Sequence, residues 1–196
     1  ISEAASLTNA ILDVYSAKRI TLSAWDLQQY DALVITKPMS AFSQADKYRL
    51  DQYIMNGGNL LLLIDKLEAT MDSASRADYF AFPYQHNLDD LLFRYGVRIN
   101  LDLVQDLNAS KTPVITGQQP SGQPRIQLLE WPFFPLVNHY ADHPITRNLD
   151  AVVTRFTSSM DTVKADGIRK TPLLLTSQYS RTVAAPVNLG INFLGN

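Results

Sequence analysis

The stretch from Tyr53 to Asp65, YIMNGGNLLLLID, places a glycine pair directly before a run of aliphatic side chains. A left-handed glycine commonly ends a helix, and a short continuous apolar run is typical of a strand buried on both faces. Upstream, Ser43 and Asp46 have the spacing of a capping box, and apolar side chains follow at helical spacing. The sequence therefore predicts a helix that starts after Ser43, ends at Gly57 or Gly58, and leads into a buried strand.

A second apolar run, ALVITKP from Ala32 to Pro38, precedes this helix and predicts another buried strand. Strand, helix and strand joined by short connections form a βαβ unit, which implies parallel pairing. We therefore expect residues 1–100 to be an α/β half with a mainly parallel, covered sheet. Residues 101–196 are richer in turn residues and short β-type runs, so we expect a β-rich half of the same single domain, 1–196.

The glycine pair also raises the question of a phosphate-binding loop. Such loops run from strand to glycines to helix, so that free amide groups at the helix N-terminus face the anion. Here the order is reversed, and the helix would present carbonyl groups, which repel phosphate. We interpret Gly57 and Gly58 as a helix stop. Asp65 is less easily assigned, because the carboxyl end of a parallel strand is where open α/β sheets bind ligands; an ordinary loop aspartate is the favoured interpretation.

Composition excludes several classes of protein. The 196 residues carry a net charge of -2, with charges scattered along the chain, so no basic footprint for nucleic acid is present. The absence of cysteine removes disulfides, thiolate metal ligands and cysteine nucleophiles. The longest apolar run, Leu60 to Ile64, is too short to span a bilayer. Because the chain begins with Ile1, we expect a soluble piece of a longer protein, with any membrane anchor outside it.

Catalytic and metal motifs are weak. No G-x-S-x-G elbow is present, and Ser158 and Ser159 are interpreted as ordinary strand or turn residues. His139 and His143 in HYADH could ligate a metal with Asp142, but the neighbouring prolines disfavour a continuous helix. Loop histidines of this kind more often hydrogen-bond to backbone. The sequence thus predicts no catalytic residues, no cofactor and no metal site.

The aromatic stretch from Glu130 to Tyr140, EWPFFPLVNHY, has two interpretations. Buried under the sheet, its rings would form part of the core, which is the favoured interpretation because large exposed aromatic patches are uncommon. Exposed, they would form an apolar groove or a sugar-stacking surface and mark a binding site.

An ordered series of short motifs resembles a known family. It comprises YDALVITKPMSAFSQADKYRLDQYIMNGGNLLLLID, then WPFFPLV, HPITRNLD, FTSSMDTV and KTPLLLTSQYS. Together they resemble the extracytoplasmic domain of gliding-motility-associated ABC-transporter auxiliary proteins, which are also described as substrate-binding components. In that family a strand and a Gly-His-Gly-Glu-like turn precede the first helix, and this chain starts at or just after that turn.

The resemblance implies a three-layer α/β fold similar to flavodoxin-like and class I glutamine amidotransferase domains. It implies a periplasmic location on the outer face of the cytoplasmic membrane, with tethering by segments outside this chain. We expect a non-catalytic accessory or substrate-binding domain whose partners are the ABC permease and ATPase subunits and a small-molecule or glycan ligand. The candidate ligand or partner crevice comprises Lys37, Asp65, Trp131, His139 and His143.

Two alternatives stay open. One is a hydrolase that uses carboxylates in place of cysteine, which requires paired acids in one cleft. The acids to consider for such a pair are Asp65, Asp89, Glu130 and Asp142. The other is a sugar-binding module on the amidotransferase-like fold, which requires aromatic rings along an open groove.

Overall fold

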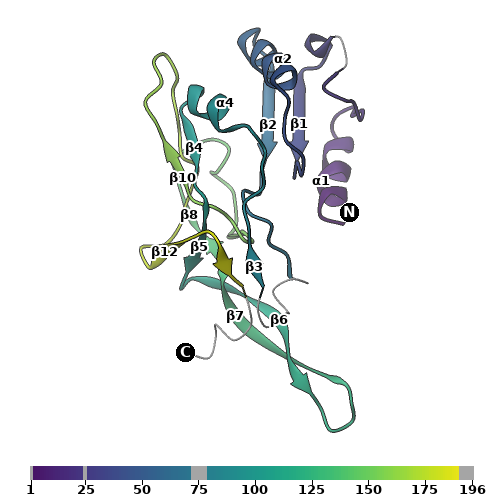
Figure 1. Cartoon of the computed structure of the whole chain (residues 1–196), viewed down its shortest axis with the longest axis vertical. Coiled ribbons are helices and arrows are strands. Elements are labelled where there is room, and N and C mark those ends of the chain that lie inside the picture. The colour runs from purple at the N-terminus through teal and green to yellow at the C-terminus, as the bar shows by residue number, and fades with distance from the viewer. Residues whose placement is uncertain (1, 24–25, 72–78, 190–196) are drawn as a thin grey trace. The chain divides into compact units, whose positions relative to one another are not determined.

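The structure is a computed structural model that describes residues 2–23, 26–71 and 79–189 (Figure 1). The chain divides into two compact units. The first unit comprises Ile1–Ile64 and His86–Leu91, and the second comprises Asp65–Gln85 and Leu92–Asn196. Each unit has its own secondary structure and is described separately below.

The first unit contains a parallel pair of strands with a helix between them in sequence. Strands β1 and β2 pair in parallel, with Ala32 opposite Asn59 and Thr36 opposite Leu63. The strand–helix–strand prediction for this segment is confirmed. The elements are α1 (Ser2–Leu12), the short 3-10 helix η1 (Leu27–Gln29), β1 (Ala32–Thr36), α2 (Gln44–Met55) and β2 (Asn59–Leu63).

Both ends of α2 follow from local sequence. Ser43 caps the N-terminus, and its hydroxyl and the Asp46 carboxylate form the reciprocal bonds of a capping box. At the other end Gly57 has a φ of 91°. Its N–H donates to Ile54 O at 2.9 Å, and Gly58 N–H donates to the carbonyl oxygen of Tyr53, also at 2.9 Å. This pair of bonds is a Schellman motif, so the glycines are a helix stop.

Gly58 has a second role besides ending the helix. A Cβ at this position would lie 2.3 Å from the ring of Tyr53, which is too close for any side chain. The Tyr53 ring is almost fully buried, and its hydroxyl donates to Tyr30 O at 2.9 Å. The ring thus joins the end of α2 to the segment that precedes β1.

The second unit is built mainly from short strands. Helix α4 (Asp89–Arg94) begins in the first unit, and its last residues belong to the second unit. The strands are β3 (Phe80–Ala81), β4 (Val97–Ile99), β5 (Asp102–Asp106), β6 (Ala109–Gln118), β7 (Pro124–Val137), β8 (His139–Tyr140), β9 (Val152–Val153), β10 (Met160–Thr162), β11 (Leu174–Leu175), β12 (Ser180–Ala184) and β13 (Val187–Asn188).

Every strand pair described in the second unit is antiparallel. β6 and β7 form a long hairpin, and β9 extends it to three strands. The turn residues between Gln118 and Pro124 lie at the tip of this hairpin. The remaining pairs join strands that are far apart in sequence: β4 with β10, β5 with β12, β8 with β11, and β3 with β13.

The core of the second unit is aromatic. The rings of Phe134 and Phe156 meet edge to face, with centroids 5.0 Å apart and an interplanar angle of 78°. Trp131 and Phe133 are buried beside them, so β7 supplies most of the large side chains. The buried cluster is completed by Leu67, Ala81, Leu103, Val187 and Leu189.

The predicted fold class is wrong. The structure is not a three-layer, mainly parallel flavodoxin-like or amidotransferase-like α/β fold, because β1–β2 is the only parallel pair in the described part of the chain. After β2 the alternation of strand and helix stops, and the later strands pair antiparallel. The expectation that β1 and β2 are buried on both faces is also wrong, since Val34, Leu61 and Leu63 are each more than two-fifths exposed.

The residues from Arg19 to Ser23 alternate in a way that is typical of a short strand, but they form none in the structure. The prediction of one domain with halves 1–100 and 101–196 stays a prediction. Among the residues that the structure describes, no helix combines the length and the apolar character needed to cross a bilayer.

Candidate functional site

Lys37 occupies an unusual backbone position at the carboxyl end of β1. Its φ is 43°, in the left-handed region, which costs a residue with a side chain about 1 kcal/mol or more. The Lys37 N–H donates to Leu63 O at 2.8 Å, and the side chain is exposed. The strained turn therefore ends the strand pair and presents a cation to solvent at the edge where the sequence predicted a ligand crevice.

The loop that follows Lys37 is held by two residues from a later segment of the first unit. His86 Nε2 lies 2.6 Å from Pro38 O, and because a carbonyl only accepts, this nitrogen carries the proton. Phe42 N–H donates to His86 O at 2.9 Å, and Asn87 Nδ2 donates to Phe42 O, also at 2.9 Å. His86 is buried and anchors backbone, a structural role that the sequence did not assign to it.

Asp65 lies two residues beyond the end of β2 and is half-buried. Parallel strands end at the same edge of a sheet, so Lys37 and Asp65 both follow carboxyl ends, as expected. Asp65 belongs to the second unit and Lys37 to the first. The crevice that they were expected to share stays a prediction.

Trp131 lies on β7 inside the core and is 2% exposed. Phe133 and Phe134 of the same strand are equally buried. The interpretation of this aromatic stretch as core is confirmed, because these rings contact other core side chains and offer no open face to a sugar. The Trp131 Nε1 has no hydrogen-bond partner within the described structure.

His139 and His143 lie close in sequence but have different surroundings. His139 is exposed on β8, opposite Leu175 of β11. His143 is half-buried in the following turn, where its Nδ1 accepts a hydrogen bond from Ile145 N–H at 3.2 Å. This backbone bond is the role expected of a loop histidine. Within residues 2–23, 26–71 and 79–189, no group of three or more His, Cys, Asp or Glu side chains could hold a metal ion.

Asp106 on β5 is a buried carboxylate that the sequence did not predict. Asp106 is 2% exposed and accepts hydrogen bonds from Ser177 Oγ at 2.5 Å, Ser177 N–H at 2.8 Å and Asn108 N–H at 2.8 Å. Burial raises the pKa of this carboxyl, but the hydrogen bonds, together with the nearby charge of His139, outweigh burial and leave the pKa below 3.8. No motif marks this pair, because Asp106 and Ser177 are far apart in sequence.

The chemistry of the Asp106 cluster is structural. In a serine nucleophile the hydroxyl proton passes to an imidazole that a carboxylate orients. Here the Ser177 hydroxyl donates directly to Asp106. A carboxylate with a lowered pKa is a poor proton acceptor, so it does not activate the hydroxyl. The hydrogen bonds instead fix the chain between β11 and β12.

A second polar network joins the ends of β4, β5 and β10. Ser159 donates to Asp102 through its hydroxyl at 2.7 Å and its N–H at 2.8 Å. Nearby, Asp161 accepts hydrogen bonds from Arg98 and Asn100, which together hold its pKa below the usual value. Ser159 is thus an ordinary structural residue, as the sequence analysis expected.

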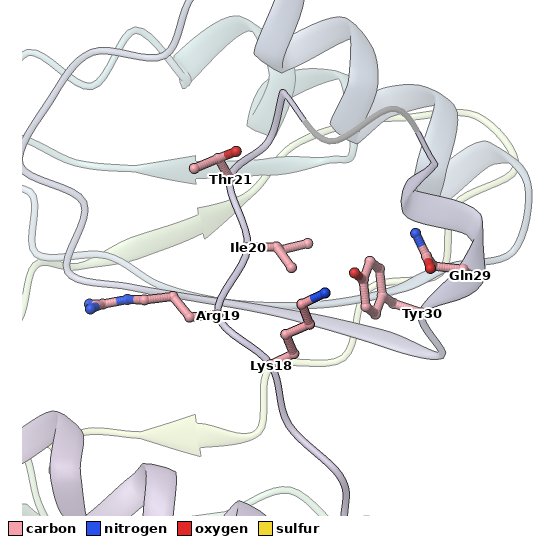
Figure 2. A pocket seen from close by; sticks show the side chains of 6 residues that line it. All are labelled: Lys18, Arg19, Ile20, Thr21, Gln29 and Tyr30. Atoms are coloured by element: carbon pink, nitrogen blue, oxygen red, sulfur yellow. The ribbon is translucent and has the colours of Figure 1, made fainter.

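The first unit carries a shallow hollow with a mixed polar and apolar lining (Figure 2). Its volume is about 710 Å³. Along the extended segment, Lys18 and Ile20 point toward Tyr30, whereas Arg19 and Thr21 point the other way, as Figure 2 shows. Lys18 brings a cation to one side, and the Tyr30 hydroxyl lies near it. Such a hollow can hold a small anionic or hydroxyl-bearing group at the surface, a feature that the sequence analysis did not identify. The full lining is Lys18, Arg19, Ile20, Thr21, Gln29 and Tyr30.

The fold has a counterpart among solved structures. The mmIFT52 N-terminal domain superposes with a TM-score of 0.59 and covers 93% of this chain and 68% of that domain's chain. The sequences are 17% identical, so the similarity concerns the fold. A search of curated proteins gave no match.

The sequence also matches a family model along nearly its whole length. Residues 1–195 match the family described as "ABC-type uncharacterized transport system". The chain therefore belongs to this family of ABC-type transport auxiliary proteins. The transport part of the expected resemblance is confirmed, and its gliding-motility and extracytoplasmic parts stay predictions.

Proposed function

We propose that this chain is a non-catalytic accessory domain of an ABC-type transport system and acts by binding a transport subunit or a transported ligand. The match of residues 1–195 to the auxiliary family carries this proposal. The buried acids support it, because Asp102 and Asp106 accept hydrogen bonds from serine and backbone groups. Groups engaged in this way hold loops in place and are poorly suited to proton transfer.

For the binding residues, we propose the exposed cations of the first unit. Lys37 extends from a strained turn, and strain at an exposed polar residue is a reason to suspect function. The loop behind it is fixed by His86 and Asn87, so Lys37 is presented by a rigid backbone. Lys18 in the hollow is a second exposed cation. Both fit an acidic protein surface or an anionic ligand group.

For location and process, we propose the periplasmic face of the cytoplasmic membrane and a transporter related to gliding motility. The ordered sequence motifs support this proposal through their resemblance to the gliding-motility proteins. The absence of cysteine is compatible with an oxidising compartment. In the second unit, Asp65, His139 and His143 remain predicted contacts for a partner or ligand.

The test is affinity purification of the full-length protein from membranes of cells that express the whole transport system. The proposal expects the ABC permease and ATPase subunits to co-purify. Lys37→Glu should reduce their recovery severalfold, whereas Lys164→Glu, an exposed lysine of the second unit, should not. A protein that purifies without transport subunits, or that shows hydrolytic turnover, would contradict the proposal.

A further inference from the structure

The β6–β7 hairpin extends away from the other strands of the second unit (Figure 1). Its strands pair from the tip, where Gln118 lies opposite Pro124, to Ala109 opposite Pro135. Between the two register shifts, the regular stretch runs from Ile115 opposite Ile126 to Lys111 opposite Glu130. A two-stranded ribbon has two faces, and side chains alternate between them along each strand. The register therefore determines which residues lie on the same face of the ribbon.

One face of this ribbon is apolar and exposed. The register places Ile115 opposite Ile126 and Pro113 opposite Leu128, and the spacing of two residues puts all four on the same face. Ile115 is 54% exposed, Ile126 63% and Leu128 67%. We call this set the ribbon face. In water such a contiguous apolar strip marks a surface that a partner covers.

The opposite face of the ribbon packs against the core near its base, whereas Gln127, closer to the tip on that face, is exposed. Leu129, which alternates with Leu128, is half-buried and packs against the core cluster. Thr112, opposite Leu129 in the register, is also half-buried. The core thus covers that face near the base of the ribbon, and isolated two-stranded ribbons are only marginally stable.

Charged residues border the ribbon face in a self-complementary way. Lys111 and Glu130 lie opposite each other at its base, on the same face as the apolar strip and exposed. Each strand therefore contributes one charge, of opposite sign, at the same level. A two-fold axis that runs along the ribbon would place β6 of one copy over β7 of the other. Lys111 would then face the second copy's Glu130, and this pair would occur twice.

We propose that the ribbon face binds a second copy of this chain in this two-fold arrangement. Ile115 of each copy packs against the second copy's Ile126, Pro113 packs against Leu128, and the charge pairs fix the register. A membrane surface would favour an excess of basic residues. The border of the ribbon face instead carries one lysine and one glutamate, Lys111 and Glu130, and this balance of charge suits a second copy of the chain. This inference does not depend on the transport function.

The first experiment measures mass against protein concentration by analytical ultracentrifugation. Because the ribbon face comprises few side chains, we expect a weak, reversible dimer with a dissociation constant of about 0.1 mM. Leu128→Asp should weaken dimerisation at least tenfold. The control is Ile145→Asp, because Ile145 is exposed to a similar extent, 64%, outside the ribbon. Circular dichroism should show that both variants remain folded, since both side chains are exposed.

The second experiment exchanges charges and mixes the variants. Lys111→Glu alone places glutamates against glutamates in the dimer, and Glu130→Lys alone places lysines against lysines, so each should be monomeric. Mixed together, they restore both charge pairs, and a heterodimer should form. The matched controls Lys164→Glu and Asp142→Lys change charge equally outside the ribbon, and each should dimerise alone as the unaltered chain does.

Three results would overturn the proposal. The unaltered chain could remain monomeric up to about 1 mM. Leu128→Asp could leave the dimer intact, which would place the interface elsewhere. The mixture of Lys111→Glu and Glu130→Lys could fail to form a heterodimer, which would exclude this two-fold arrangement. If co-purification of transport subunits is lost in Leu128→Asp while the chain is monomeric throughout, the ribbon face binds a transport subunit and the second copy is excluded.

Discussion

Ser177 binds both oxygens of the Asp106 carboxylate: its hydroxyl oxygen lies 2.5 Å from Oδ1, and its backbone nitrogen lies 2.8 Å from Oδ2. Asp106 is the last residue of β5 and lies opposite Ser180, the first residue of β12. The two hydrogen bonds therefore fix the turn that leads into β12 at the point where its pairing with β5 begins. A buried carboxylate in this position stabilises a contact between distant segments of the chain.

The first prediction concerns pH. Because the folded-state pKa of Asp106 is below 3.8, its carboxylate stabilises the fold above that pH, and the stabilisation is lost as the pH falls through the folded-state pKa. Asp106→Asn should lower the free energy of unfolding by about 2 kcal/mol at neutral pH, since hydrogen bonds to a charged group are lost. The difference from the unaltered protein should shrink below about pH 4 in urea titrations.

The control for the pH prediction is Asp142→Asn, because Asp142 is exposed in the same unit. It should unfold like the unaltered protein across the same pH range. A difference between Asp106→Asn and the unaltered protein that stays constant down to pH 2 would contradict the proposed role of the charged form.

The second prediction concerns the contact between Gly58 and Tyr53. Gly58→Ala should destabilise the protein by about 1–3 kcal/mol, because the added Cβ would lie 2.3 Å from the Tyr53 ring. Thermal unfolding of Gly58→Ala, Tyr53→Leu and the double variant gives the interaction energy between the two positions. The penalty of the alanine should be smaller in the Tyr53→Leu background, where the ring is absent.

Gly57→Ala separates the backbone effect from the packing effect. A Cβ at Gly57 meets no atom within 4 Å, but the φ of 91° strains any residue with a side chain. Its cost, about 1–2 kcal/mol, should not change in the Tyr53→Leu background. Equal coupling at both glycines would argue against a specific contact at Gly58.

The third prediction concerns the ion pair of α2. Lys47 Nζ lies 2.8 Å from Asp90 Oδ2, and the Lys47 side chain is buried while that of Asp90 is largely exposed. The hydrogen bond from Lys47 is the main reason why the pKa of Asp90 is lowered. Asp90→Ala leaves a buried ammonium group without its carboxylate and should cost about 1 kcal/mol.

Lys47→Met is the informative comparison for this pair. It removes the buried charge and keeps an apolar side chain of similar length, so we expect a smaller loss of stability than for Asp90→Ala. Chemical denaturation of both variants and of the double variant measures the difference. A larger loss for Lys47→Met would show that the charge, and not the buried stem, carries the stability.

The fourth prediction distinguishes core from ligand surface at Trp131. Trp131→Ala should cost about 3–5 kcal/mol because it removes a large buried side chain. Trp131→Phe should cost about 1–2 kcal/mol, since the indole N–H has no hydrogen-bond partner among the described residues. Thermal unfolding measures both losses. An alanine variant of unchanged stability would contradict the core placement.

Local sequence was sufficient to predict the helix α2 and its flanking strands. Ser43 and Asp46 specify the helix start by their side-chain chemistry, and Gly57 specifies its end by its left-handed backbone. Parallel pairing of β1 and β2 followed from the strand–helix–strand order. All of these are interactions between residues near one another in sequence, or consequences of a short connection.

The architecture of the second unit could not be predicted in the same way. The pairs β5–β12 and β4–β10 join segments of about five and three residues that are widely separated in sequence, and such short strands carry little periodic signal. Phe156 has a φ of 50° and interrupts the β-type run from Ala151 to Met160. The hydrogen bonds of Asp106 to Ser177 depend on these distant pairings, so they could not be predicted from local sequence either.

The ring of Tyr53 covers Gly58 and its hydroxyl donates to Tyr30 O, so one side chain of α2 contacts both the turn after this helix and the segment before β1. Natural variation at these positions should consequently be correlated. Homologues that keep an aromatic residue at position 53 must keep glycine at position 58, and any lineage that acquires a larger residue at 58 should first have lost the ring. An alignment of the family would show this as an evolutionary coupling between the two positions.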